Sequence, residues 1–104
     1  MRADVSRGHL DLLLLGSVAR RPLHGYAIVE AIRDASEGAF DLREGTVYPA
    51  LYRLEAAGLL ASETSVSGGR KRRTYRLTRR GRKELAEQRQ DWRAFVHAVE
   101  AVTT

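Results

Sequence analysis

The side chains best suited to binding chemistry lie in the segment 45–60, GTVYPALYRLEAAGLL. As a helix with 100° between residues, this segment would bury one stripe of apolar and small residues: Val47, Ala50, Leu51, Leu54, Ala57 and Gly58. The opposite face then carries Tyr52 and Arg53, with Thr46 and Tyr48 at its edges. Arginine offers a planar fork of donors that fits phosphate or guanine, and a tyrosine hydroxyl donates to phosphate oxygens. The face is therefore either a nucleic-acid-binding surface or a solvated helix face with incidental aromatics.

A cluster of positive charge follows this segment. Nine of the 18 Lys and Arg residues lie between positions 70 and 83, where no acidic residue occurs: Arg70, Lys71, Arg72, Arg73, Arg76, Arg79, Arg80, Arg82 and Lys83. The net charge of +5 comes from this one region, because the rest of the chain has slightly more acidic than basic residues. Its place after a helix with exposed tyrosines favours double-stranded DNA as the partner. A solvated surface and an RNA-binding surface are the alternatives.

Composition argues against several other classes. With 104 residues, 43% hydrophobic and 30% charged, the chain is expected to form one folded domain. It has no cysteine, its longest apolar run (12–15) is too short to span a bilayer, and residues 1–4 begin no secretory signal, so we expect a cytoplasmic protein without membrane contact. His9, His24 and His97 are too scattered to bind a metal, and no catalytic grouping or phosphate loop is present. The sequence predicts neither an enzyme nor a cofactor.

Most helices can be placed from periodicity and turn signals. Residues 8–20 and 24–36 are expected to form two helices, separated by a break at Pro22, and Gly38 ends the second. Thr78 is a suitable cap for a last helix that runs to about residue 102.

The start of the third helix is open. Asp41, Arg43 and Thr46 are all possible caps, and Pro49 lies in the first turn only if Thr46 is the cap. Gly58 is expected to end this helix.

Two predicted strands, 59–66 and 70–78, flank the two-residue hairpin signal Gly68-Gly69. With this loop, the numbers of paired positions add up to 137, so that Leu60 lies opposite Leu77 and Ser62 opposite Tyr75. The ribbon is then apolar at its base and basic at its tip, as a wing is.

The last helix carries an apolar seam. Two rows of side chains recur every seven residues, Leu85, Trp92 and Val99 in one and Gln88, Phe95 and Val102 in the other. The first helix also has more apolar surface than one small core requires. We therefore predict a homodimer with this interface: Leu10, Leu13, Leu14, Leu85, Trp92, Phe95, Val96 and Val99. The alternative is that the seam folds back on its own core.

Three helices, a hairpin and a fourth helix make a winged helix-turn-helix, and the residues closely resemble the PadR family of transcriptional regulators, in its small subgroup with one C-terminal helix. The similar segments are LDLLLLGSVARRPLHGYAIVEAI (10–32), GTVYPALYRLEAAGLL (45–60), RRTYRLTRRGRKEL (72–85) and Trp92, within about residues 8 to 96. The succession of HGY, GTVYPAL and YRLT is specific. One departure is visible, because the family often has Ser-Pro where this chain has Arg43-Glu44.

The resemblance implies a mainly α-helical fold with a small β-hairpin: a winged helix-turn-helix over 1–78 and a C-terminal dimerisation helix over 79–104. It implies a homodimeric repressor that binds a palindromic operator, with the third helix in the major groove and the wing over the minor groove or backbone. The implied DNA contacts are Thr46, Tyr48, Tyr52, Arg53, Arg70, Lys71, Arg72 and Arg73. A small aromatic effector bound beside Trp92 and Phe95 is also implied. A winged-helix adaptor that binds protein or RNA is the alternative.

Overall fold

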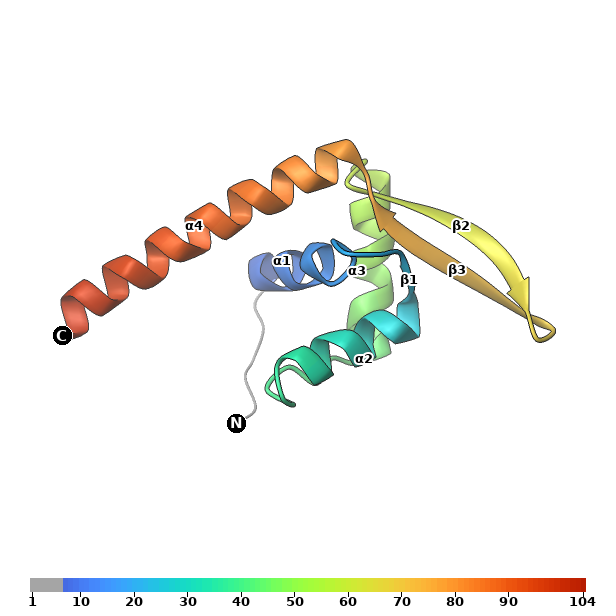
Figure 1. The fold of residues 1–104 in the computed structure, drawn as a ribbon, viewed down its shortest axis with the longest axis horizontal. Coiled ribbons are helices and arrows are strands. Elements are labelled where there is room, and N and C mark those ends of the chain that lie inside the picture. Colours follow the sequence, from blue (N-terminus) through green and yellow to red (C-terminus); the bar gives the residue numbers. More distant parts are fainter. Residues whose placement is uncertain (1–6) are drawn as a thin grey trace.

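The computed structural model describes residues 7–104; residues 1–6, which include the segment predicted to carry no signal, lie outside the described residues. The helices are α1 (Arg7–Ser17), α2 (Gly25–Ala35), α3 (Glu44–Ala56) and α4 (Arg79–Thr103). The strands β1 (Leu23–His24), β2 (Leu60–Ser67) and β3 (Arg70–Leu77) form an antiparallel sheet with the order β1-β3-β2. Figure 1 shows the β2–β3 hairpin projecting from one side of α1–α3 and α4 extending to the other. The predicted mainly helical winged arrangement is confirmed.

The core forms where α1, α2 and α3 meet the base of the hairpin and the start of α4. Its buried side chains are Leu10, Leu14, Leu15, Val18, Ile28, Val29, Ile32, Val47, Ala50, Leu51, Leu54, Leu60, Tyr75, Leu77 and Leu85. On α3 the predicted stripe is buried at Val47, Ala50, Leu51 and Leu54. The prediction is wrong for Ala57, which is exposed because the helix ends at residue 56 and the chain turns away.

Three residues predicted to lie at a dimer interface belong instead to the core of their own chain. Leu14 is 0% exposed, and Leu10 and Leu85 are also buried. The correction has a simple cause: α1 packs against α2, α3 and α4, so more than one of its faces is covered within the chain. Leu13 is partly buried against the same core.

Helix α3 begins at Glu44, so Arg43 is the cap among the three that the sequence allows. The Arg43 side chain makes no capping hydrogen bond, and Thr46 lies inside the first turn. Pro49 is therefore within the helix, where it lacks the N–H that would reach the carbonyl of Gly45. The predicted end at Gly58 is confirmed: its φ is +80°, and the Leu59 N–H donates to the Leu54 carbonyl at 3.0 Å, which closes the helix as a Schellman motif.

The hairpin has the predicted register. Leu60 pairs with Leu77, Ser62 with Tyr75 and Ser67 with Arg70. Gly68 and Gly69 have φ values of +58° and +76°, which a tight two-residue loop requires and which glycine adopts without strain. The short strand β1 was not predicted; it pairs with β3 at Tyr75 and Thr74, and two residues are too few to produce a periodic pattern.

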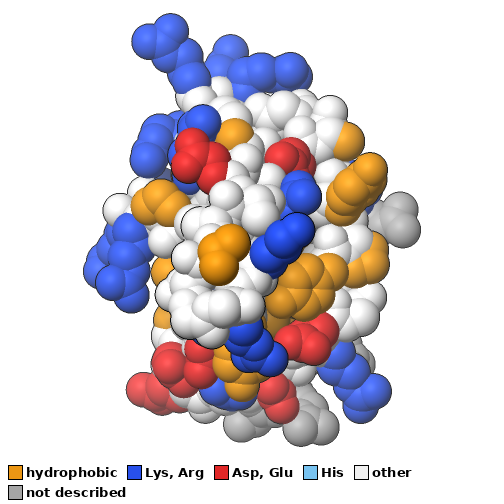
Figure 2. All heavy atoms as spheres, turned by 90° about the vertical axis from the view of Figure 1, so that its right-hand side faces the viewer, with side chains coloured by type: hydrophobic (Ala, Val, Ile, Leu, Met, Phe, Trp, Pro, Cys, Tyr) orange, Lys and Arg blue, Asp and Glu red, His pale blue; other side chains and the backbone are white. Residues whose placement is uncertain are grey.

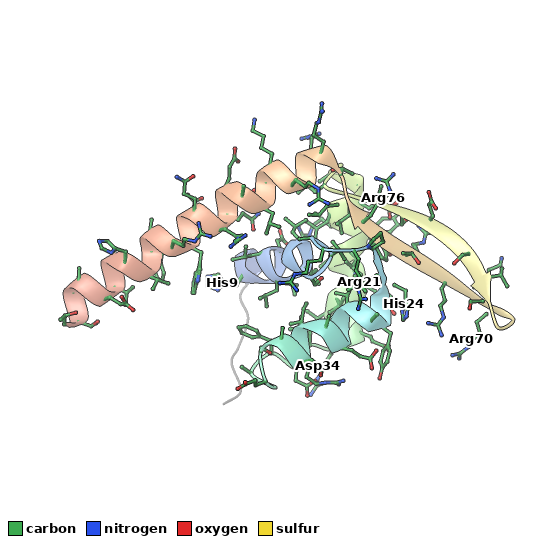
Figure 3. All side chains as sticks on the ribbon, viewed as in Figure 1. His9, Arg21, His24, Asp34, Arg70 and Arg76 are labelled. Carbon is green, nitrogen blue, oxygen red and sulfur yellow. The ribbon has the colours of Figure 1, made fainter. Side chains whose placement is uncertain are left out.

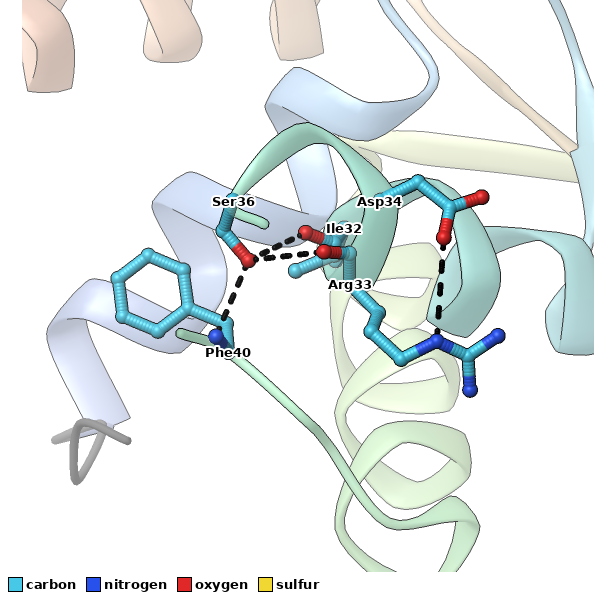
Figure 4. A network of polar contacts seen from close by, with 5 residues as sticks. All are labelled: Ile32, Arg33, Asp34, Ser36 and Phe40. Carbon is cyan, nitrogen blue, oxygen red and sulfur yellow. Dashed lines mark hydrogen bonds and ion pairs between the residues drawn. The ribbon is translucent and has the colours of Figure 1, made fainter. Parts of the chain in front are cut away.

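The helix ends are fixed by polar side chains. Thr78 caps α4 as predicted, because its Oγ1 accepts from the Gly81 N–H at 3.0 Å, and the hydroxyl also donates to the Gly58 carbonyl at 2.7 Å. At the end of α2, the Ser36 hydroxyl donates to the Ile32 carbonyl at 2.7 Å and accepts from the Phe40 N–H at 3.0 Å (Figure 4). The hydrogen bond from the Phe40 N–H to Ser36 sets the direction in which the chain leaves α2 towards α3.

Candidate nucleic-acid interface

The turn between β1 and α2 positions a side chain of α3. His24 caps α2, because its Nδ1 accepts from the Ala27 N–H at 3.3 Å, as expected of a residue at a helix start. A Cβ atom on Gly25 would overlap the ring of Tyr48, so the absence of a side chain lets this ring lie directly on the first turn of α2. Tyr48 remains 41% exposed. Burial, with a smaller contribution from Glu44, raises the pKa of Tyr48, so the hydroxyl stays protonated and can donate.

The helices and the hairpin enclose a groove of about 610 Å³. Its lining comes from the β1–α2 turn, the start of α3 and the wing: His24, Gly25, Tyr26, Glu44, Tyr48, Arg70, Lys71, Arg72 and Arg73. Figure 3 shows His24 at the start of α2 and Arg70 on the hairpin, near its tip. One wall of the groove is therefore cationic and the other aromatic, with Tyr26 half exposed.

The four basic residues predicted on the wing are not equivalent. Arg70 and Lys71 are exposed at the hairpin tip. Nη1 of Arg72 lies 2.8 Å from Nε2 of His24. Whether Nε2 accepts from Arg72 depends on the tautomer of the ring, but this contact engages only one of the five N–H donors of the guanidinium. The guanidinium of Arg72 therefore remains able to bind an anion.

Arg73 is engaged inside the protein. Its Nη1 lies 3.7 Å from the Glu55 carboxylate and donates to the Ser62 hydroxyl at 3.3 Å. Ser62 in turn donates to Glu55 at 2.7 Å. This network ties the base of the wing to the end of α3, so Arg73 fixes the hairpin more than it offers a free charge.

The exposed side of α3 has two edges and a centre. Tyr48 is at the edge next to the groove, Tyr52 is 74% exposed near the centre, and Thr46 is exposed. Arg53 lies at the other edge, where its Nη1 and Nη2 donate to the two carboxylate oxygens of Asp11 on α1, at 3.1 and 2.6 Å. Donation to the Asp11 carboxylate raises the pKa of Arg53, which therefore stays charged.

A second hollow, of about 330 Å³, lies between α1 and α4. It is lined by Gly8, His9, Asp11, Leu12, Gln88, Asp91, Trp92 and Phe95. The rings of His9 and Trp92 meet edge to face with their centroids 5.3 Å apart, and the rings of Trp92 and Phe95 stack with their centroids 5.9 Å apart. Gln88 donates to Glu84 at 2.9 Å, whereas its buried Oε1 has no partner among the described residues. The hollow thus combines aromatic surface with oxygen acceptors.

The free part of α4 exposes an apolar stripe. Trp92 is 43% and Phe95 58% exposed, and Val99 and Val102 are also exposed. With 25 residues the helix is about 37 Å long, and Figure 1 shows its C-terminal half standing away from the other elements. A contiguous apolar stripe of this kind marks a contact surface.

Charge is unevenly distributed over the molecule. Seen along the hairpin, Lys and Arg side chains predominate over the upper and left parts of the face, whereas Asp and Glu side chains are more frequent over the lower part, where Lys and Arg also occur (Figure 2). In the described part of the chain, no cluster of His, Cys, Asp or Glu could hold a metal ion. Among the helices of residues 7–104, none is long and apolar enough to cross a membrane.

The sequence profile of the transcriptional regulator PadR-like family matches residues 14–87. The chain belongs to this family. It is 40% identical over 86 residues to the transcriptional regulator Rv3488 of Mycobacterium tuberculosis, covering 83% of this chain and 78% of that protein. A PadR family regulator of Clostridium difficile superposes with a TM-score of 0.80 at 32% identity, over 91% of this chain and 98% of that one. PadR of Bacillus subtilis, solved in complex with operator DNA, has a TM-score of 0.70 at 25% identity, over 75% of this chain and 45% of that one.

Membership confirms the resemblance on which the sequence interpretation was based, and members of the PadR-like family are transcriptional regulators, not enzymes. In this PadR-like chain, the predicted residues Tyr48, Arg70, Lys71, Arg72 and Arg73 share one groove. Thr46, Tyr52 and Arg53 lie outside its lining, on the neighbouring surface of α3.

Sequence reasoning missed five contributors to this region: His24, Gly25, Tyr26 and Glu44, which line the groove, and Asp11, which binds Arg53. Gly25 and Tyr26 belong to the HGY motif, whose place in the resemblance could have signalled a role. Asp11 gave no signal, because its partner Arg53 lies 42 residues further along the chain.

We predict that Gly25→Ala lowers the free energy of unfolding by about 1–3 kcal/mol, because the new methyl group displaces the Tyr48 ring. In a Tyr48→Ala background the same change should cost less than about 0.5 kcal/mol, since the overlapping ring is gone. Urea unfolding at one fixed protein concentration measures both values. Equal costs in the two backgrounds would contradict the assigned contact.

Proposed function

We propose that this PadR-like regulator represses transcription in the cytoplasm by binding a palindromic operator as a homodimer, with α3 in the major groove and the wing along the backbone or minor groove. The observation that carries the proposal is the exposed, tyrosine-bearing side of α3 beside a cationic wing. The operator complex of Bacillus subtilis PadR, which has the same fold, supports DNA as the partner.

Phosphate binding and sequence reading are assigned to different elements. Arg70, Lys71 and Arg72 line one wall of the groove, and Tyr48 can donate from the other, so a phosphate of the backbone fits between them. Tyr52, near the centre of the exposed side of α3, is placed to meet base edges when the helix enters the major groove. In this proposal the wing supplies affinity for any DNA duplex, and α3 supplies the preference for one base sequence over others.

Dimerisation follows from the apolar stripe of α4. Trp92, Phe95 and Val99 are exposed within one chain, and a second copy of the helix would bury them. Such a pairing suits a palindromic site, because two equivalent recognition helices must reach half-sites about 34 Å apart. Leu13 and Val96, which are partly buried, remain candidates at the margin of this contact.

A ligand site is assigned to the hollow between α1 and α4. Trp92 and Phe95 provide a stacking surface, and the oxygens of Asp11, Asp91 and Gln88 provide acceptors, so the hollow suits a planar aromatic cation. Because the hollow borders the predicted dimer contact, occupancy would change how the two α4 helices pair and thereby release the operator.

The second candidate function is a winged-helix adaptor that binds protein or RNA. The same cationic wing supports it, because phosphate contacts do not distinguish the two nucleic acids. The first experiment below separates the two functions.

For DNA binding, duplexes are selected by the protein from a random pool and compared with random duplexes and structured RNA. Arg70→Ala and Lys71→Ala should each weaken binding to all duplexes alike and reduce the salt dependence by about 0.9 log units per log unit of salt. Tyr52→Ala should instead lower the preference for the selected duplex by about tenfold. Tighter binding of structured RNA than of any duplex would favour the adaptor.

For dimerisation, Phe95→Glu should convert the protein from dimer to monomer at micromolar concentration, because it places a charge in the apolar stripe. Ala94→Glu is the matched control: it adds the same charge to the preceding residue, which is exposed, lies 100° around α4 from Phe95 and is outside the apolar stripe, so it should leave the dimer intact. Sedimentation equilibrium measures both. A monomeric unsubstituted protein would contradict the dimer.

For ligand binding, a naphthylmethylammonium ion should quench the fluorescence of Trp92, the only tryptophan in the chain, and release the selected duplex over the same concentration range. Phe95→Ala should weaken the quenching by removing the stacked ring. Val102→Ala removes an exposed apolar side chain outside the hollow and should leave the quenching unchanged. Equal quenching in both variants would exclude the assigned site.

A further inference from the structure

The ion pair between Asp11 and Arg53 joins α1 to the exposed side of α3. Nη1 of Arg53 donates to Oδ2 of Asp11 at 3.1 Å and Nη2 donates to Oδ1 at 2.6 Å, in a parallel two-bond arrangement. The Asp11 side chain is 18% exposed and that of Arg53 44% exposed. The donor fork of Arg53 is therefore already satisfied within the protein, although the side chain borders the surface that would face DNA.

Two features argue that this pair does more than brace α1 against α3. A partly exposed ion pair contributes little to folding stability, and apolar side chains of both helices already pack in the shared core. Arg53 also follows the highly exposed Tyr52 directly and is turned from it by 100° around the helix. A shift of the side chain away from Asp11 would suffice to present its fork beside Tyr52.

Electrostatics makes the pair sensitive to DNA. A carboxylate at the edge of the reading surface repels a polyanion, and in the pair it also neutralises the charge of Arg53. Guanine edges and phosphates offer the same two-acceptor geometry that Asp11 offers, so they can take its place. Binding of Arg53 to DNA is thus an exchange of partners, and its net gain is smaller than that of a free arginine.

We propose that Asp11 is the positioning residue of Arg53: it holds the guanidinium on α1 in the free protein, and Arg53 contacts DNA only where a guanine or phosphate replaces the carboxylate. This inference rests on the proposed DNA-binding function. It makes Asp11, which touches no DNA itself, a determinant of specificity, because only sites that present a suitable acceptor release Arg53.

The test is a double-mutant cycle of Asp11→Asn and Arg53→Ala on duplexes that the unsubstituted protein selects from a random pool. Asparagine keeps the shape of aspartate but loses its charge and one acceptor. Asp11→Asn should tighten binding to random duplexes by about tenfold and increase the salt dependence by about 0.9 log units per log unit of salt, because one more cation is free to meet a phosphate. The preference for selected over random duplexes should fall. In the Arg53→Ala background, Asp11→Asn should change little.

Glu87→Gln is the matched control, because it removes the same charge from an exposed residue of α4 that lines neither hollow. Equal effects of Asp11→Asn and Glu87→Gln, or an undiminished effect without Arg53, would overturn the inference and leave only the loss of a negative charge. Weaker DNA binding by both Asp11→Asn and Asp11→Ser, each checked for folding by circular dichroism, would also overturn the inference. The ion pair would then serve only to hold α1 against α3. If the unsubstituted protein selects no duplex, the proposed function fails and the inference fails with it.

Discussion

Burial of one stripe of α3 decides which of its side chains face outward. Val47, Leu51 and Leu54 are buried against α1, α2 and the base of the hairpin. Burying an aliphatic side chain of this size contributes about 1.5–3 kcal/mol, so turning the helix about its axis would expose apolar surface at a cost comparable to the whole stability of a small domain. The exposed arc is therefore fixed, and each of its edges has its own contact: Tyr48 on Gly25 at one edge and Arg53 on Asp11 at the other.

The same fixed frame explains why a run of basic residues does not act as a uniform charge. Although the nine side chains follow one another closely in sequence, Arg73 is held by Glu55, and Arg82 donates to the Ala19 carbonyl at 3.2 Å. Arg70 and Lys71, at the tip of the ribbon, remain exposed. The tip of the wing therefore carries exposed positive charge that is not engaged by the contacts that hold Arg73 and Arg82.

Local signals predicted the parts of this structure that depend on neighbouring residues. Gly68-Gly69 set the hairpin register, and Thr78 and Gly58 marked helix ends, because turns and caps are decided within a few residues. The contacts at the edges of α3 could not be predicted in this way, since Gly25 and Tyr48, like Asp11 and Arg53, meet only after the helices pack.

Periodicity also failed to assign the apolar surface of α1. It identified apolar side chains but could not tell which of them meet their own core and which meet another chain, and so Leu10 and Leu14 were assigned to the wrong surface.

Helix α4 has two roles: it completes the core at one end and exposes an apolar stripe at the other. Its first turns, through Leu85, complete the core, whereas Trp92 and the residues beyond it extend past the other elements. A rigid helix transmits position along its length, so whatever pairs with the projecting end also sets the orientation of the wing and of α3. The hollow at Trp92 lies between these two parts, beside α1 and its Asp11, so a small displacement there reaches both the projecting stripe and the edge of α3 that Arg53 occupies.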